Sequence, residues 1–324
     1  MNEKPPEIPT ELRPGPSDVS FDLDLVLSSI VSVHAEIPED GFTAGSLGTD
    51  RQGHGVVIAD GGLVLTIGYL VVEATSVWMI DSTGRAIAGH VTGYDQETGF
   101  GVIQALEPVD LTPMRIGRSD ELSVGEPVIF AGSGGRSQAL KTEIASIREF
   151  AGYWEYLLDR AIFTSPPHPF WGGGALIGPD GTLRGIGSLY VQDAVRDGEA
   201  QDGNMVVPID ILEPILGDLV TTGSANRPRR PWLGMFSAEA AGKVIVAGLW
   251  EGGPAESAGI EIGDLVLEVE GTPVTGMADM LRRIWALGEA GIEVPLIIFR
   301  DRGVREIVIP SARREDFHKA PRLH

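Results

Sequence analysis

The sequence predicts a mainly β protein with two parts, a large all-β domain followed by a smaller α+β domain. Two observations support this fold class. Between residues 53 and 208 the chain is a series of short β-rich segments bounded by turn residues, and no long helical pattern separates them. Over residues 231–312, strand-like segments alternate with two segments of helical periodicity.

Length and composition fit two ordinary globular cores, because the chain has 324 residues of which 43% are hydrophobic. The 46 acidic and 25 basic side chains give a net charge of −21, which repels phosphate backbones and anionic lipid head groups. We therefore expect neither nucleic acid nor a membrane as a partner. Without cysteine there is no disulfide, no thiolate metal site and no thiol nucleophile, and we expect no metal or cofactor.

The start of the chain is polar and rich in proline, without a basic stretch leading into an apolar core. No apolar run reaches the roughly 18 residues that a membrane-spanning helix needs. Together with the absence of cysteine, these features predict a cytoplasmic location. The domain boundaries are expected as follows: a flexible arm over 1–19, the first domain over 20–220, a linker over 221–230, the second domain over 231–312 and a frayed tail over 313–324.

The first domain is expected to begin with a short helix and a strand within residues 21–33, followed by a glycine-turn hairpin over 53–66. Further strands are expected at residues 76–80, 87–94, 101–105, 127–131, 143–150, 161–164 and 204–208. A helix should follow over 209–220, where apolar residues repeat at helical spacing. In the second domain we expect strands at 243–250, 263–269, 293–300 and 304–309, and helices at 253–260 and 277–287.

Residues 165–188 form a tight glycine-rich loop that leads into a hairpin with a Pro-Asp-Gly turn. Residues 170–176 read Phe-Trp-Gly-Gly-Gly-Ala-Leu. This stretch resembles the nucleophile loop of HtrA-type (DegP-like) trypsin-like serine proteases, whose pattern is G-N-S-G-G-P-L. The resemblance covers roughly residues 45–220 and implies a trypsin-like double β-barrel. The bacterial members of that family are mostly exported, so the predicted cytoplasmic location departs from them.

The resemblance assigns the catalytic triad to three positions, and each holds another residue. Tyr69 stands where the family has its histidine in L-T-N-A-H-V-V, since residues 65–71 read Leu-Thr-Ile-Gly-Tyr-Leu-Val. Gly99 replaces the aspartate and Gly172 replaces the serine. Acyl transfer by this route needs an oxygen nucleophile and a base with a pKa near neutrality. Glycine supplies neither and tyrosine is a poor base, so on this alignment a conventional serine-protease mechanism is excluded.

Other groups near the loop have alternative interpretations. The backbone N–H groups of Trp171, Gly172 and Gly173 would form a nest like an oxyanion hole, which binds a carbonyl or carboxylate without cleaving it. Phe170 and Trp171 either cover the former cleft, line a peptide groove or simply pack the loop. His168 is interpreted as a loop histidine rather than a replacement base. The remaining candidates are scattered, and they are the histidines His34, His54 and His90 and the displaced nucleophiles Ser133, Ser165 and Ser188.

The aromatic segment 150–158 is interpreted as the core of a hairpin or as a subunit or partner surface. The second domain resembles an HtrA-type PDZ domain, through Pro-Trp-Leu-Gly-Met at 231–235, the glycine-rich turn and helix of 253–264 and the helix of 277–287. The resemblance implies that Trp232, Leu233, Gly234 and Met235 bind a peptide C-terminus, with backbone N–H groups on its carboxylate and the next strand edge pairing with the peptide. Arg229 and Arg230 either strengthen anion capture or are a solvated pair.

The sequence thus favours a catalytically inactive HtrA-like protein, in which a barrel scaffold carries a PDZ domain that binds peptide or protein C-termini. The alternative is an active endopeptidase with relocated catalytic residues, suggested by the intact glycine pattern. A third class is a regulatory subunit of a larger complex, suggested by the acidic surface and the aromatic loop. The resembled family commonly forms trimers through N-terminal aromatic contacts, for which Phe21 is the candidate here.

Overall fold

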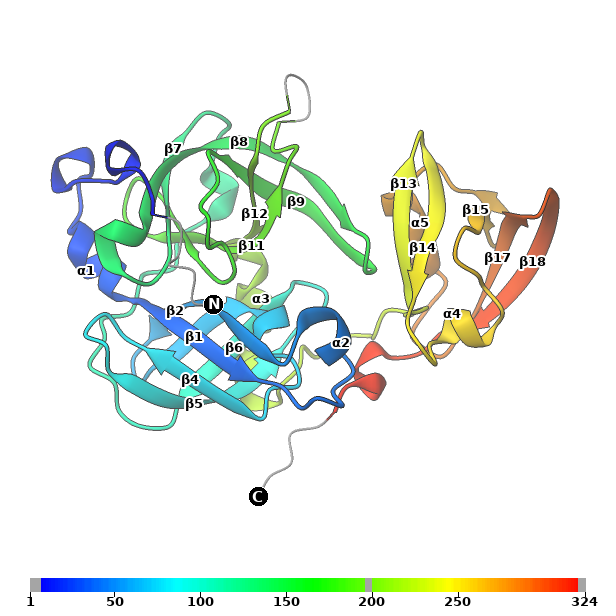
Figure 1. Cartoon of the computed structure of the whole chain (residues 1–324), viewed down its shortest axis with the longest axis horizontal. Coiled ribbons are helices and arrows are strands. Elements are labelled where there is room, and N and C mark those ends of the chain that lie inside the picture. Colours follow the sequence, from blue (N-terminus) through cyan, green and yellow to red (C-terminus); the bar gives the residue numbers. More distant parts are fainter. Residues whose placement is uncertain (1–6, 196–199, 320–324) are drawn as a thin grey trace. The chain divides into compact units, whose positions relative to one another are not determined.

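The structure is a computed structural model, and it describes residues 7–195 and 200–319 (Figure 1). The described chain divides into two compact units. The second unit consists of Glu149–Asp159 and Arg227–His318, and the first contains the rest. The first unit ends at Asn226 and the C-terminal part of the second begins at Arg227, so this boundary lies within the predicted linker. The earlier stretch Glu149–Asp159 was not expected to group with it.

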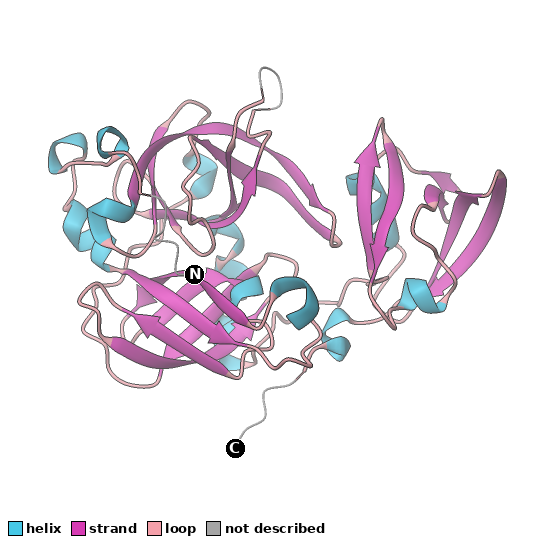
Figure 2. Ribbon diagram, viewed as in Figure 1, coloured by secondary structure: helices cyan, strands magenta, loops and turns pink. Residues whose placement is uncertain are grey.

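The first unit is built on two closed barrels of six strands each (Figure 2). The first barrel has the order β1 (Ile30–Glu36), β2 (Asp50–Ala59), β3 (Leu63–Ile67), β6 (Phe100–Ala105), β5 (Ala86–Tyr94), β4 (Ser76–Ile80). The second has the order β10 (Ala175–Ile177), β11 (Leu183–Val191), β12 (Gly203–Pro208), β9 (Tyr156–Ser165), β8 (Ala139–Gly152), β7 (Pro127–Ala131). Closure leaves no free edge in either barrel, and inward-facing apolar side chains fill each interior.

The core of the second barrel shows how the strand pattern produces packing. Alternate residues of its strands point inward, and large apolar side chains meet there because a strand turns successive side chains to opposite faces. The cluster consists of Leu122, Val128, Phe130, Ile144, Ile162, Leu176 and Val206. Helices α1 (Leu23–Ser28), α2 (Ala44–Leu47) and α3 (Glu213–Thr221) complete the first unit.

The second unit is an antiparallel sheet with two helices, and its apolar core includes Leu157 from the end of β9. The strand order is β13 (Met235–Ala240), β14 (Lys243–Leu249), β15 (Leu265–Val269), β17 (Glu293–Arg300), β18 (Gly303–Pro310), and β16 (Thr272–Pro273) pairs with β15. Helix α4 (Pro254–Ser257) is short, whereas α5 (Met277–Ala286) buries Met280, Leu281 and Ile284 at helical spacing. The mainly β prediction is confirmed, and the expected strands and helices appear within a few residues of their predicted bounds.

Both ends of the described chain are more ordered than the sequence suggests. Residues 1–6 of the predicted flexible arm lie outside the described residues, but residues 7–19 contain two 3₁₀ turns and Ile8 is only 2% exposed. In the predicted tail, residues 314–317 form another such turn, and Phe317 packs 4.8 Å from Trp232. Single buried apolar side chains therefore fix segments whose composition predicts disorder.

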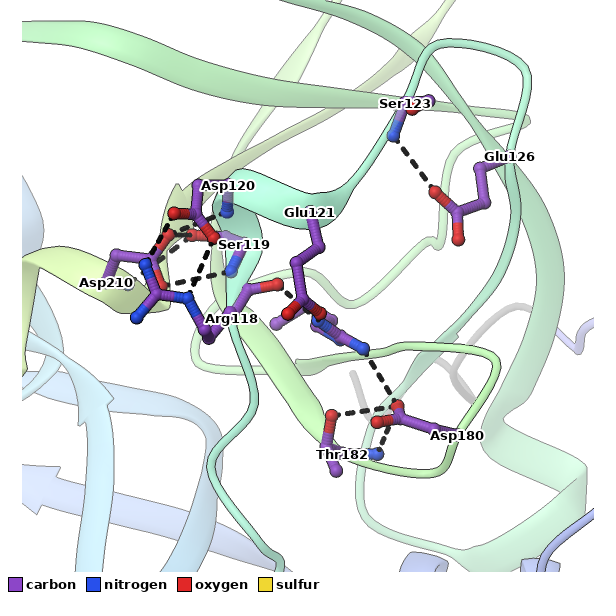
Figure 3. A network of polar contacts seen from close by, with 10 residues as sticks. Arg118, Ser119, Asp120, Glu121, Ser123, Glu126, Asp180, Thr182 and Asp210 are labelled. Atoms are coloured by element: carbon purple, nitrogen blue, oxygen red, sulfur yellow. Dashed lines mark hydrogen bonds and ion pairs between the residues drawn. The ribbon is translucent and has the colours of Figure 1, made fainter.

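Acidic side chains of the first unit make hydrogen bonds and ion pairs within the fold (Figure 3). The Asp210 carboxylate accepts hydrogen bonds from the backbone N–H groups of Ser119 and Asp120 and from the Ser119 hydroxyl, which caps a 3₁₀ turn. The buried Arg184 pairs with Glu121 and Asp180, at 2.7 and 3.1 Å.

Within the described ranges no three His, Asp or Glu side chains are grouped to hold a metal ion, and no helix is long and apolar enough to span a bilayer.

Candidate functional site

Tyr69 and Gly172 lie side by side at the position where the resemblance places catalytic chemistry. Tyr69 follows β3 in a 3₁₀ turn, Gly68–Leu70, and Gly172 lies in the loop between β9 and β10. A Cβ atom on Gly172 would stand 2.8 Å from the phenol oxygen of Tyr69. That oxygen donates a hydrogen bond to the Ser188 carbonyl, also at 2.8 Å. The phenol therefore occupies the space that a side chain of residue 172 would need.

Gly99 joins the same region through the backbone. Its carbonyl accepts a hydrogen bond from the Gly68 N–H at 2.6 Å, so it neighbours the turn that carries Tyr69. Gly99 has a φ of +84°, a conformation in which glycine is favoured. The nearby Asp95 does not replace the missing carboxylate, because it accepts bonds from the N–H and hydroxyl of Thr98. The structure thus brings Tyr69, Gly99 and Gly172 together, and none of these three residues carries an aliphatic hydroxyl, an imidazole or a carboxylate.

Tyr69 stays a neutral phenol at physiological pH. Burial raises the pKa of Tyr69 above its ordinary value, and a hydrogen bond with the Trp171 side chain partly opposes that rise. Trp171 packs against the core of the second barrel, with its ring 5.7 Å from that of Tyr190. These contacts support the interpretation in which Trp171 packs the loop, here over Tyr69.

The predicted nest at Trp171, Gly172 and Gly173 is only partly available. The Gly173 N–H donates to the Gly187 carbonyl at 2.9 Å, so Gly173 has no N–H left for a ligand. The Phe170 N–H is likewise used, since it donates to Nδ1 of His168 at 3.0 Å. A carbonyl of β11 and the ring of His168 accept hydrogen bonds from these two N–H groups, because the loop packs against both. Gly173 therefore does not belong to a ligand-binding nest.

His168 is a buried structural histidine, as the sequence interpretation favoured. It is fully buried and stacks on Phe130 with ring centroids 5.2 Å apart. Its Nε2 bonds to the Gln138 carbonyl at 3.1 Å, and its Nδ1 accepts from Phe170, so both ring nitrogens are satisfied. Burial lowers the pKa of His168, which keeps the imidazole neutral.

His54 lies beside the loop, although no pattern in the sequence indicated this proximity. Its backbone N–H donates to the Gly172 carbonyl at 2.8 Å, and its Nδ1 accepts from the Ser133 N–H at 3.1 Å. Its Nε2 is buried without a hydrogen-bond partner among the described residues. A neutral imidazole whose Nδ1 accepts carries its proton on Nε2. His54 therefore offers no lone pair to activate a hydroxyl.

His54 should make the protein less stable in mild acid. Burial and the proximity of His168 lower its pKa to about 4, whereas the unfolded chain should titrate near 6.5. Between these values the unfolded state binds more protons, so the stabilising effect is complete above pH 6.5 and is lost as pH falls towards 4. The full effect is about 3 kcal/mol. Urea unfolding between pH 4.5 and 7 should give a shallower pH dependence for His54→Gln, and an unchanged slope would contradict this assignment.

The three displaced serine candidates have other contacts. Ser188 is buried, and its backbone carbonyl accepts the hydrogen bond from Tyr69. The Ser165 hydroxyl donates to the Asp202 carbonyl at 2.9 Å. Ser133 approaches His54 through its backbone N–H. None of these contacts is a hydroxyl-to-base hydrogen bond of the kind that activates a nucleophile.

Three of the four predicted peptide-binding residues converge on one carboxylate. The N–H groups of Leu233, Gly234 and Met235 point to the side chain of Glu155, at 2.7 to 3.0 Å. Gly234 has a φ of +76°, which allows this turn. The Trp232 N–H donates instead to the Ala312 carbonyl, so Trp232 does not contribute a donor. The loop therefore holds a carboxylate of its own chain, and no sequence signal pointed to Glu155 as its occupant.

Comparisons with known proteins match both parts of the chain. A family model for a trypsin-like peptidase domain matches residues 53–186, and one for a PDZ domain matches residues 245–286. A probable periplasmic serine endoprotease DegP-like of Pseudomonas fulva (strain 12-X) is 27% identical over 287 residues, which are 82% of this chain and 57% of that protein. The serine protease PepD of Mycobacterium tuberculosis (strain ATCC 25618 / H37Rv) is 26% identical over 85% of this chain and 61% of that protein. The chain spans little more than half the length of these relatives.

Solved structures support the fold. The HtrA-type protease AlgW with decapeptide matches with a TM-score of 0.53 at 18% identity, covering 90% of this chain and 98% of that one. The serine endoprotease from Yersinia pestis matches with a TM-score of 0.51 at 20% identity, covering 91% and 98%. The chain therefore combines a trypsin-like domain with a C-terminal PDZ domain, as in HtrA/DegP-like serine proteases.

The predicted cytoplasmic location is wrong. Several similar curated proteins, from Pseudomonas fulva, Pseudomonas fluorescens and Pseudomonas putida, are named periplasmic serine endoproteases, and this finding contradicts the prediction. The absence of cysteine misled the prediction, because an oxidising compartment permits disulfides without requiring them.

Proposed function

We propose that this HtrA-like chain is a proteolytically inactive protein that binds peptides or proteins, as a scaffold or a regulatory subunit, and that its PDZ domain recognises C-termini. The observation that carries the proposal is the position of the Tyr69 phenol, 2.8 Å from where a Cβ of residue 172 would stand. The site has no oxygen nucleophile at residue 172, and the group beside it is a phenol that hydrogen-bonds a backbone carbonyl.

The imidazoles nearby do not supply the missing chemistry. His168 uses both ring nitrogens in hydrogen bonds, and His54 uses Nδ1 to accept a backbone N–H. General-base catalysis needs a lone pair directed at the nucleophile's proton, within hydrogen-bond reach. This arrangement favours binding over bond cleavage.

The PDZ half of the proposal rests on the loop of residues 233–235. Three backbone N–H groups that converge on one carboxylate are the donors that a peptide C-terminus needs. Strand β13, which follows this loop, is the first strand of its sheet, and this edge is the place for an added peptide strand. On the names of its relatives we place the protein in the periplasm. Assembly into trimers remains a prediction from the resemblance, and Phe21 packs beside Gly181 of its own chain.

Activity-based labelling of the full chain tests the inactive assignment. We expect no adduct with a fluorophosphonate probe and no digestion of an unfolded protein such as casein. Digestion that persists in Tyr69→Phe and is blocked by a serine-directed inhibitor would establish the alternative, an endopeptidase with relocated residues; mapping the adduct would then identify its serine. In parallel, peptides with a free apolar C-terminus should bind and their C-terminally amidated forms should not. Equal binding of both forms would overturn C-terminal recognition.

A further inference from the structure

The tip of the hairpin formed by β8 and β9 packs into the second unit. Leu157 is part of that unit's apolar core, and Ala151 packs against it. The Tyr153 ring lies 5.8 Å from that of Phe236 on β13. The aromatic segment that the sequence left open as a hairpin core or a partner surface therefore contacts a surface of the same chain.

The carboxylate of Glu155 fills the carboxylate-binding loop. Its Oε1 accepts from the N–H groups of Gly234 and Met235 at 2.7 and 2.9 Å, and its Oε2 accepts from that of Leu233 at 3.0 Å. The two oxygens of Glu155 thus accept from the N–H groups of all three residues of the loop, Leu233, Gly234 and Met235. A peptide C-terminus would have to compete for the same three N–H groups.

The backbone next to Glu155 also follows the geometry of an added peptide strand. The Ser237 N–H of β13 donates to the Tyr153 carbonyl at 2.8 Å. The hairpin thus places a carboxylate in the loop and, two residues earlier in the chain, a backbone carbonyl against the strand edge. Carboxylate capture followed by main-chain pairing is how an extended peptide binds this kind of edge.

The position of Glu155 follows from the hairpin and from its surroundings. Glu155 has a φ of +62° as the last residue of the three-residue turn between β8 and β9, and this turn aims its side chain at the loop. Burial raises the pKa of the Glu155 carboxyl, against the opposing effect of its three N–H donors and of Arg314. The three N–H donors therefore hold a buried carboxyl group against the cost of removing it from water.

We propose that Glu155 is an internal ligand of the PDZ domain, and that peptides with a free C-terminal carboxylate bind by displacing the hairpin tip from the loop of residues 233–235. This inference rests on the proposed function of the loop. It adds that the site is occupied in the resting protein, so that the chain controls its own access to C-termini.

Displacement has a measurable consequence for affinity. The apparent affinity for a peptide falls in proportion to the fraction of protein whose loop is open. If the hairpin occupies the loop in nine molecules of ten, the apparent dissociation constant is raised about tenfold. Removing the internal carboxylate should therefore tighten peptide binding by roughly that factor.

The test measures binding of a fluorescent decapeptide with a free apolar C-terminus to the full chain, with its amidated form as a second probe. The variants are Glu155→Gln and Glu155→Ala. The control is Asp24→Asn, which removes the same charge from an exposed carboxylate that pairs with Arg136 within the first unit and does not touch the hairpin tip. We expect both Glu155 variants to bind the free peptide about tenfold more tightly than the wild type, and the control to bind like the wild type.

The outcomes separate the two proposals. If neither the wild type nor any variant binds the free peptide more tightly than the amidated one, C-terminal recognition itself is refuted. If the wild type shows that preference and the Glu155 variants bind with unchanged affinity, recognition stands and the internal ligand is refuted. A gain shared equally by Asp24→Asn would also refute it, since the effect would then come from net charge.

Hydrogen exchange in the unmodified protein gives a readout that does not depend on how the variants fold. Saturating free peptide should increase amide exchange in residues 150–156, because the hairpin tip leaves the loop, while the amidated peptide should not. Peptide that binds and leaves this exchange unchanged, or slows it, would overturn the displacement model.

Discussion

Replacing Gly173 by alanine should destabilise the barrel unit by about 3 to 5 kcal/mol. Gly173 has a φ of +78°, and a Cβ there would lie 1.9 Å from the His54 carbonyl oxygen and 2.6 Å from the Thr66 hydroxyl. That carbonyl is held by its hydrogen bond from Thr66, so it cannot move away without breaking the contact. Urea unfolding should show a lower midpoint at an unchanged slope, which reports a change in stability rather than in the surface exposed.

Gly217→Ala is the matched control for this prediction. Gly217 lies within α3, and a Cβ there would meet no atom within 4 Å. Alanine is the better helix former, so this change should leave stability the same or raise it by about 1 kcal/mol. Equal stability of the two variants would show that the loop around Gly173 is not packed as the structure describes.

Restoring the serine alone should not restore the protease. In Gly172→Ser the new side chain would meet the Tyr69 hydroxyl, and the resulting strain should cost about 1 to 3 kcal/mol. The variant should also remain unreactive towards a fluorophosphonate probe, because residue 69 supplies no base. Thermal or urea unfolding and probe labelling of the same preparation measure both effects.

A double-mutant cycle with Tyr69→Ala isolates the cause. Once the phenol is removed, adding the serine should cost less than in the wild-type background, with a coupling of about 1 to 2 kcal/mol. Tyr69→Phe narrows the cause to the hydroxyl, since it keeps the ring atoms, at 3.7 and 3.9 Å from a Cβ on Gly172, and removes the oxygen at 2.8 Å; the serine should cost less in this background too. Additive effects in the cycle would mean that Tyr69 does not occupy the space beside Gly172, and labelling of Gly172→Ser would mean that another group acts as its base.

Much of the fold was accessible from the sequence because its signals are local. Glycine turns and short β-rich runs located most barrel strands, and the periodicity of Met280, Leu281 and Ile284 located helix α5. The Glu149–Asp159 stretch was assigned to the first domain for the same reason, since its neighbours along the chain are barrel strands. Its place in the second unit depends on contacts with residues about eighty positions away, such as the bond between Glu155 and Gly234.

The sequence by itself determined that residues 99 and 172 carry no side chain and that residue 69 is a phenol, because these facts belong to single residues. Only the tertiary structure decided what fills the space beside Gly172, how the lone pairs of His54 and His168 are used, and which carboxylate lies in the loop of residues 233–235. These outcomes arise from packing and hydrogen bonding between segments distant in the chain, and the pattern of residues along one segment does not encode which partner will meet it.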